Sequence, residues 1–265
     1  MTRRILIALD AAAPRRDALD AVTALYRETA LEIAGIFIED DNLKRLATLP
    51  FAREIRLSGQ LSQGFDSNLL RQQLDACAAE FESIFARARS ALQSPVSFRV
   101  LHGDVLLALR QAAAESDLVV VGRSLARAGL RTWLGVAPEQ LLDALAGTPT
   151  RAGLLFVHEP WASGRCVMVL DDGSDAARRA KEQAQAMADA DSLPLEFCRL
   201  AGSEVDADYD EAEPVPAIAD LEELRRHCQA RDPRLLVLPD SPALRQRIDL
   251  RELLCDLPAS VAITR

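Results

Sequence analysis

The sequence predicts an α/β fold, with two tandem, open, mostly parallel five-stranded sheets that carry helices on both faces in the Rossmann-like manner. Short uncharged apolar runs such as ILIAL (5–9) and LVVVG (118–122) alternate with longer segments of helical period. That alternation is typical of a parallel sheet buried on both faces. The same order then restarts near residue 164.

In the first half, strands are expected at 5–9, 31–38, 97–101, 118–122 and 153–157. Helices are expected at about 17–28, 68–91, 104–115 and 137–146. Each strand is a short apolar run, and each helix shows apolar residues at three- and four-residue spacing.

The second half repeats this order. RRILIALD (3–10) aligns with GRCVMVLD (164–171), and further strands are expected at 195–200, 234–240 and 258–264. An acidic stretch, SEVDADYDEAEPVP (203–216), replaces the long segment that follows strand two in the first half. We therefore divide the chain into a first domain (1–157), a linker (158–164) that contains Pro, Ser and Gly, and a shorter second domain (165–265).

Composition restricts the classes of function. The chain has 265 residues, 49% of them hydrophobic, and a net charge of −9, so its field repels nucleic acid and anionic membranes. No apolar run reaches the ~18 residues of a membrane helix, and ILIAL is too short for a signal peptide. Five scattered cysteines without a CxxC pair suit a reducing compartment. We expect a cytoplasmic protein.

One partial motif stands where the fourth strand of the first half ends. Asp10 ends the first strand; Gly122 is followed by Leu125, Gly135 and Val136 at the spacing G-x2-G-x9-G-[S/T]. In repeat order and in this motif, the chain resembles a tandem universal stress protein. The resemblance implies that the two halves pack as an internal pseudo-dimer. Leu125 replaces the second glycine of the family motif, and Val136 replaces its Ser or Thr.

The resemblance implies an adenine-nucleotide site (ATP, ADP or AMP) in the first half. Backbone N–H groups at a helix N-terminus would hold the phosphates. Leu125 can fill the space for a phosphate, and Val136 removes a hydroxyl donor worth about 1 kcal/mol. Arginines at 123, 127 and 131 either compensate or form a solvated face. The candidate cofactor-binding residues are Asp10, Gly122, Arg123, Arg127, Gly135 and Val136.

The other polar candidates favour structural roles. In His102-Gly103-Asp104, the aspartate is placed to cap a helix. His227 and Cys228 are helix neighbours that do not face the same way, and no zinc site is expected. The acidic run 204–213 lacks the central glycine of a calcium loop. In the second half, Pro239 and Arg247 stand about where motif glycines belong. We predict no catalytic residue and no metal.

Residues 39–60 interrupt the first half on the ligand side of the sheet. Leu43, Leu46, Leu49, Phe51 and Ile55 form an apolar set around Pro50. This segment either covers the core, forms a lid or offers an apolar patch to a partner.

The expected function is that of a non-enzymatic stress-response regulator that acts through protein or ligand binding. Its partner is an unidentified protein, reached through the segment from Leu43 to Ile55. Two alternatives are an adenine-nucleotide sensor and a slow nucleotide hydrolase. Assembly into a further homo-oligomer stays open.

Overall fold

The fold was analysed in a computed structural model, which describes residues 2–9, 17–26, 30–49, 67–92, 94–122, 136–146, 152–158, 161, 163–203, 215–257 and 259–265. Within these ranges the strands are β1 (Arg3–Leu9), β2 (Leu31–Asp40), β3 (Val96–Gly103), β4 (Leu118–Gly122), β5 (Gly153–Val157), β6 (Cys166–Asp171), β7 (Leu195–Leu200), β8 (Ala217–Ile218), β9 (Pro233–Pro239) and β10 (Ser260–Thr264). The helices are α1 (Asp17–Leu25), α2 (Asp41–Ala47), α3 (Ser67–Ala91), α4 (Val105–Ala112), η1 (Ala113–Glu115), α5 (Pro138–Ala146), α6 (Asp175–Asp191), α7 (Leu221–Arg231), α8 (Pro242–Arg247) and α9 (Leu250–Asp256).

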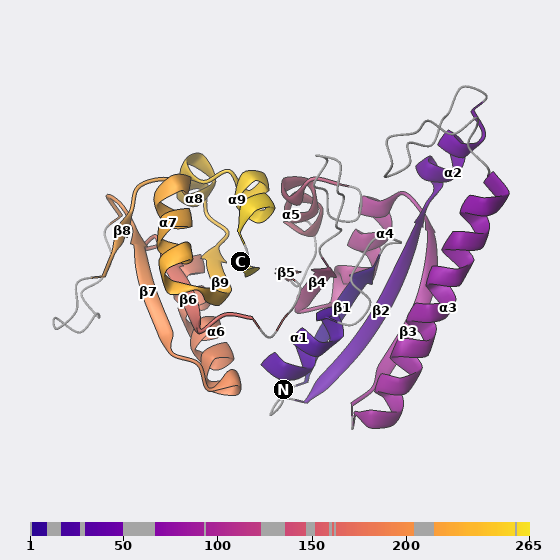
Figure 1. Ribbon diagram of the computed structural model, residues 1–265, viewed down its shortest axis with the longest axis horizontal. Coiled ribbons are helices and arrows are strands. Elements are labelled where there is room, and N and C mark those ends of the chain that lie inside the picture. Colours follow the sequence, from indigo (N-terminus) through magenta and orange to yellow (C-terminus); the bar gives the residue numbers. More distant parts are fainter. Residues whose placement is uncertain are drawn as a thin grey trace.

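The described strands form one sheet of ten, in the order β3-β2-β1-β4-β5-β10-β9-β6-β7-β8 (Figure 1). The expectation of two separate five-stranded sheets is therefore wrong. Each half keeps the same order, since β8-β7-β6-β9-β10 corresponds to β3-β2-β1-β4-β5. All neighbours within a half are parallel.

The physical reason for the single sheet lies at β5 and β10. These strands end the two parallel sets, and they pair antiparallel, with Leu155 opposite Ala262. An unpaired edge would leave a row of N–H and C=O groups without partners. Pairing the two edges satisfies those groups and joins the halves through the backbone.

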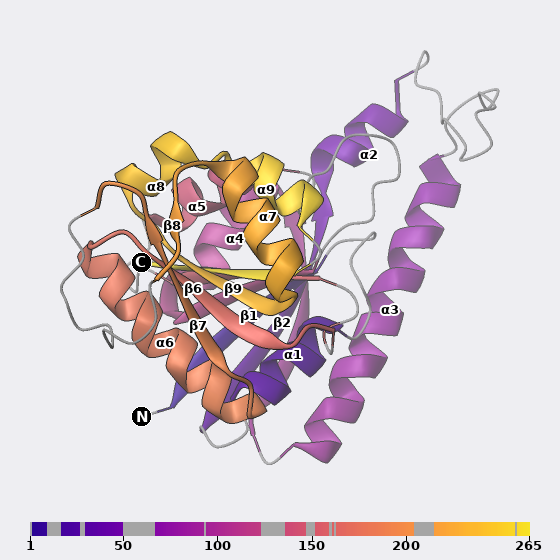
Figure 2. The same ribbon diagram turned by 60° about the vertical axis from the view of Figure 1, so that its left-hand side comes forward.

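Helices cover both faces of the sheet (Figure 2). Buried side chains of α1, α3 and α6 form one core with one face, and those of α4, α5, α7, α8 and α9 form a second core with the other. The sheet residues between them are buried on both sides; the pattern in β4 and β6 is continuous burial. This is the three-layer arrangement that the uncharged strands predict.

The sequence places most elements to within a few residues, and its departures are local. β8, α2, α8 and α9 have no counterpart among the expected elements. α2 follows β2 directly because the Asp40 carboxylate caps it, accepting a hydrogen bond from the Asn42 N–H at 2.8 Å. The N-cap expected at Asp104 is confirmed by the bond from the Leu107 N–H at 2.9 Å.

Candidate functional site: the carboxyl edge of the sheet

In the first half, strand order reverses at β1, which lies between β2 and β4. Open α/β sheets bind ligands beyond the carboxyl ends of the strands at such a reversal. Gly122, the last residue of β4, is buried there and lies opposite Val157 of β5. The structure thus places this predicted residue at the edge where a ligand would bind.

The remaining predicted residues fall in two groups. Asp10, Arg123, Arg127 and Gly135 lie outside the described residues, as do Leu125 and Arg131. Val136 is described: it is half-buried and packs against the core formed with α4 and α5. Its side chain therefore contributes apolar packing at the position where the family motif has a hydroxyl.

The N-terminus of α5 already has its own partners. The Ala137 N–H donates to Oε1 of Gln140 at 3.0 Å, which is one half of a capping box. Glu139 places a carboxylate in the first turn, where it complements the helix dipole. That carboxylate also accepts from the Arg251 N–H of α9 at 3.2 Å. These described groups do not fit a phosphate, because one donor is taken and the resident charge is negative.

The corresponding edge of the second half is bridged by side chains. Asp171 is 1% exposed; its carboxylate accepts from the Gly173 N–H at 2.9 Å and pairs with Nζ of Lys181 at 2.9 Å. Asp172, also buried, accepts from the Ser174 N–H at 3.0 Å and from the hydroxyl of Ser241.

Ser241 belongs to the loop after β9, and Asp172 to the loop after the neighbouring strand β6. Their hydrogen bond therefore joins these two loops across the point where the strand order reverses. The same oxygen caps α8 by accepting from the Leu244 N–H at 3.0 Å. Gly173 adopts φ 77°, the region in which glycine is favoured, so that the turn after β6 can fold back. The second half is thus closed at this edge by its own polar groups.

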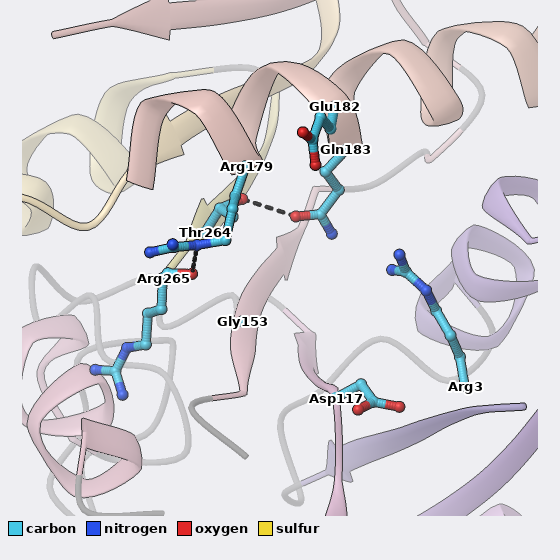
Figure 3. A pocket seen from close by; sticks show the side chains of 8 residues that line it. All are labelled: Arg3, Asp117, Gly153, Arg179, Glu182, Gln183, Thr264 and Arg265. Carbon is cyan, nitrogen blue, oxygen red and sulfur yellow. Dashed lines mark hydrogen bonds between the residues drawn. The ribbon is translucent and has the colours of Figure 1, made fainter. Parts of the chain in front are cut away.

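A pocket of about 260 Å³ lies where the halves meet (Figure 3). It is lined by Arg3, Asp117, Gly153, Arg179, Glu182, Gln183, Thr264 and Arg265. The Thr264 hydroxyl donates to Oε1 of Gln183 at 2.7 Å, and Nε of Arg179 donates to the Arg265 carbonyl oxygen. Because these polar groups already bind one another, we interpret the pocket as part of the junction between the halves.

The Arg265 guanidinium strengthens this junction. It is 7% exposed, and burial lowers its pKa. Its Nε pairs with Asp240 at 3.1 Å, and it donates to the Leu142 carbonyl oxygen of α5. A residue at the end of the second half therefore binds a helix of the first half.

α2 lies at the end of β2, beyond the body of the sheet (Figure 1). Of the predicted apolar set, Leu43 is half-buried, whereas Leu46 is 54% and Leu49 38% exposed. Phe51 and Ile55 lie outside the described residues. In the part that is described, the segment covers the core only partly and leaves two leucines in solvent.

Cysteine and histidine are dispersed. His227 is half-buried, and burial lowers its pKa; Cys228 beside it is buried, and burial raises its pKa to about 12. Among the described residues, no group of three or more His, Cys, Asp or Glu side chains is placed to hold a metal ion. The described helices include none long and apolar enough to cross a membrane.

Sequence reasoning missed two polar pairs, one at the carboxyl ends of the strands in each half. Asp172 and Ser241 are 69 residues apart, and no local pattern links them. Glu39 and His102 are cross-strand neighbours in β2 and β3. Their signal was present, since each polar residue closes an apolar strand and adjacent parallel strands end at the same edge.

The fold and this edge define an open α/β protein whose two halves share one strand order. Comparison with known proteins gives no matching family model and no matching curated protein. Solved structures do match. A universal stress protein from Archaeoglobus fulgidus DSM 4304 superposes with a TM-score of 0.65 at 10% identity, covering 99% of this chain and 96% of that one.

A putative universal stress protein from Pseudomonas aeruginosa UCBPP-PA14 has a TM-score of 0.56 at 14% identity, covering 99% of this chain and 92% of that one. A functionally unknown protein from Pseudomonas aeruginosa PAO1 has a TM-score of 0.54 at 13% identity, with the same coverage. At these identities the likeness establishes the fold: this chain has the α/β fold of solved universal stress proteins over its whole length.

Proposed function

We propose that this chain is a tandem universal stress protein that works as a non-enzymatic, cytoplasmic regulator by binding a protein partner. Its domains are the first (1–157) and the second (165–265), joined by residues 158–164. The likeness in fold and the strand order common to both halves support this assignment. The second domain serves as a structural companion, because Asp172 and Ser241 bridge the edge where its ligand would lie.

The observation that carries the partner-binding proposal is the exposure of Leu46 and Leu49 beside the carboxyl edge. Burying an exposed leucine side chain on association contributes roughly 1.5–3 kcal/mol. Both residues lie at or just after the end of α2, a short helix at the periphery of the fold. A partner with an apolar groove can cover both without disturbing either core.

The test compares three proteins as baits: the native chain, the Leu46→Ser/Leu49→Ser variant and the Leu107→Ser variant. Leu107 is a matched control because it is 55% exposed on α4 and lies outside this segment. Captured proteins are quantified by mass spectrometry, and the partner is then purified for titration. We expect at least about a tenfold loss of affinity with the double variant and none with the control. Equal affinity for all three baits would refute the proposal.

An adenine-nucleotide sensor is the second candidate, favoured by the buried Gly122 at the strand reversal. The groups of α5 that are described do not fit a phosphate, so this function would depend on Asp10, Arg123, Arg127 and Gly135. Calorimetry with ATP, ADP and AMP decides it: heat that saturates below millimolar ligand supports the sensor. A hydrolase would in addition release ADP above a denatured control.

A further inference from the structure

A second pocket, of about 450 Å³, lies at the carboxyl ends of β2 and β3, between α2 and the start of α3. It lies away from the reversal at β1 and from the junction of the halves. Its size is within the range of small-molecule sites, roughly 300–1,000 Å³. It is lined by Glu39, Lys44, Ala47, Thr48, Ser67, Asn68, Leu70, Arg71, Leu74, Asp75 and His102.

A buried carboxylate forms the inner end of this pocket. The Glu39 side chain is 9% exposed, and its Oε2 lies 2.5 Å from Nζ of Lys44 and 3.1 Å from Nδ1 of His102. A buried carboxylate is stable only with such partners. Because Lys44 neutralises Glu39, this inner pair adds no net charge to the pocket.

The same contacts orient His102. Nδ1 of His102 lies 3.1 Å from Oε2 of Glu39 and 3.4 Å from Nζ of Lys44, so this pair fixes the side of the ring that carries Nδ1. In the tautomer that donates from Nδ1 to Glu39, Nε2 is an acceptor. The His102 side chain is 61% exposed, which leaves Nε2 accessible to a ligand that carries a donor.

α3 supplies the opposite wall. Leu74 is buried and Leu70 half-buried, and both give this wall an apolar surface. Ala47 of α2 adds an apolar residue to the lining. Arg71 and Asp75 flank it one helical turn apart. Both are exposed, and neither side chain forms an ion pair or hydrogen bond within the described part of the chain.

This arrangement specifies the chemistry of a ligand. Arg71 offers a planar cation that matches a carboxylate, and Asp75 offers an acceptor for an ammonium group. Leu70 and Leu74 form the neighbouring row of the same helix and offer an apolar surface to a side chain. We propose that the pocket binds a small zwitterion with an apolar side chain, which is the chemistry of a free apolar α-amino acid.

The ammonium and carboxylate groups of such a ligand are bonded to the same carbon, and Arg71 and Asp75 lie on adjacent turns of one helix. The ammonium group lies between the Asp75 carboxylate and Nε2 of His102, to which it also donates. The volume favours a large side chain over a small one, since a phenyl ring fills space that a methyl group leaves to water.

The experiment titrates the full ¹⁵N-labelled chain with three matched ligands and follows the amide resonances of α3. Phenylalanine carries both charges, 3-phenylpropionate only the carboxylate, and phenethylamine only the ammonium group. At ordinary binding efficiency for about a dozen non-hydrogen atoms, we expect phenylalanine to bind with Kd in the ~millimolar range. Each single-charge ligand lacks one charge-assisted bond and should bind at least about tenfold more weakly.

The variants test each contact by selectivity, which a folding defect would not reproduce. Arg71→Gln should reduce phenylalanine binding about tenfold or more and make it equal to phenethylamine binding. Asp75→Asn should make it equal to phenylpropionate binding instead. Arg87→Gln is the control, because Arg87 is an exposed arginine 16 positions further along the same helix, about 24 Å away; it should change nothing.

Two results would overturn the proposal. One is the lack of any saturable shift in α3 with the three ligands. The other is equal affinity of the native protein for phenylalanine and for either single-charge ligand. Neither result bears on the partner surface, whose leucines do not line this pocket.

Discussion

Replacing Ser241 with alanine tests whether the second half is closed by its own polar groups. The hydroxyl has two roles: it donates to the buried Asp172 carboxylate, and it caps α8 by accepting from the Leu244 N–H at 3.0 Å. Alanine removes both bonds at a residue that is 4% exposed. The expected destabilisation is therefore larger than for an ordinary cap.

The magnitude follows from the two bonds. A hydrogen bond to a charged group contributes about 1.5–3 kcal/mol, and a serine N-cap about 0.5–2 kcal/mol. We expect Ser241→Ala to lower the free energy of unfolding by about 2–5 kcal/mol. At about 2–4 °C per kcal/mol for a chain of this size, Tm falls by roughly 4–20 °C.

Ser174→Ala is the matched comparison, since Ser174 caps α6 through the Ala177 N–H at 3.1 Å. Ser174→Ala removes a helix cap in the turn after β6, and should lower the free energy of unfolding by only about 0.5–2 kcal/mol. Urea denaturation followed by circular dichroism measures both variants. Equal costs for Ser241→Ala and Ser174→Ala would refute the argument, because the bond to Asp172 would then contribute nothing.

Three further predictions concern packing, backbone and thiols. A Cβ at Gly35 would lie 2.4 Å from the buried ring of Phe85, so Gly35→Ala should lower the free energy of unfolding by roughly 1–3 kcal/mol. In a double-mutant cycle, Phe85→Leu should reduce that cost, and an unchanged cost would contradict the clash. Ser192, the C-cap of α6, has φ 53°, so Ser192→Gly should raise the free energy of unfolding by up to about 1 kcal/mol and shift the urea midpoint upward. A lower midpoint would count against backbone strain there. Burial raises the pKa of Cys198, and that of Cys228 to about 12, so neither thiol ionises appreciably at pH 8. Mass spectrometry should find both unlabelled by DTNB in the folded chain and labelled in urea, and rapid labelling of the folded chain would refute their burial.

The sequence predicted the layers of the fold because burial on both faces leaves a local trace. A strand such as LVVVG at 118–122 has no polar position, and the structure buries every residue of β4. Asp104 was likewise recognisable as a cap, because an N-cap and the N–H that it accepts from are three residues apart. Gly122 was expected to end the fourth strand, and it does.

The candidate site was less accessible to the same reasoning. The motif predicted a glycine and a hydroxyl position, yet the groups that occupy the N-terminus of α5 are Gln140 and Glu139. Glu139 is further engaged by Arg251, 112 residues away. A carboxylate in a first turn is readable from sequence, but its partner in the other half is not.

By itself, the sequence determined the alternation of strands and helices and the repeat of that order, because apolar runs and helical spacing can be read along the chain. The exposure of Leu46 and Leu49 was decided by the structure. Only the tertiary structure decided that the halves share one sheet through β5 and β10. It also decided that Ser241 reaches Asp172, and that Glu39 meets His102. These contacts depend on the register between distant strands, which side-chain pattern along one strand does not specify.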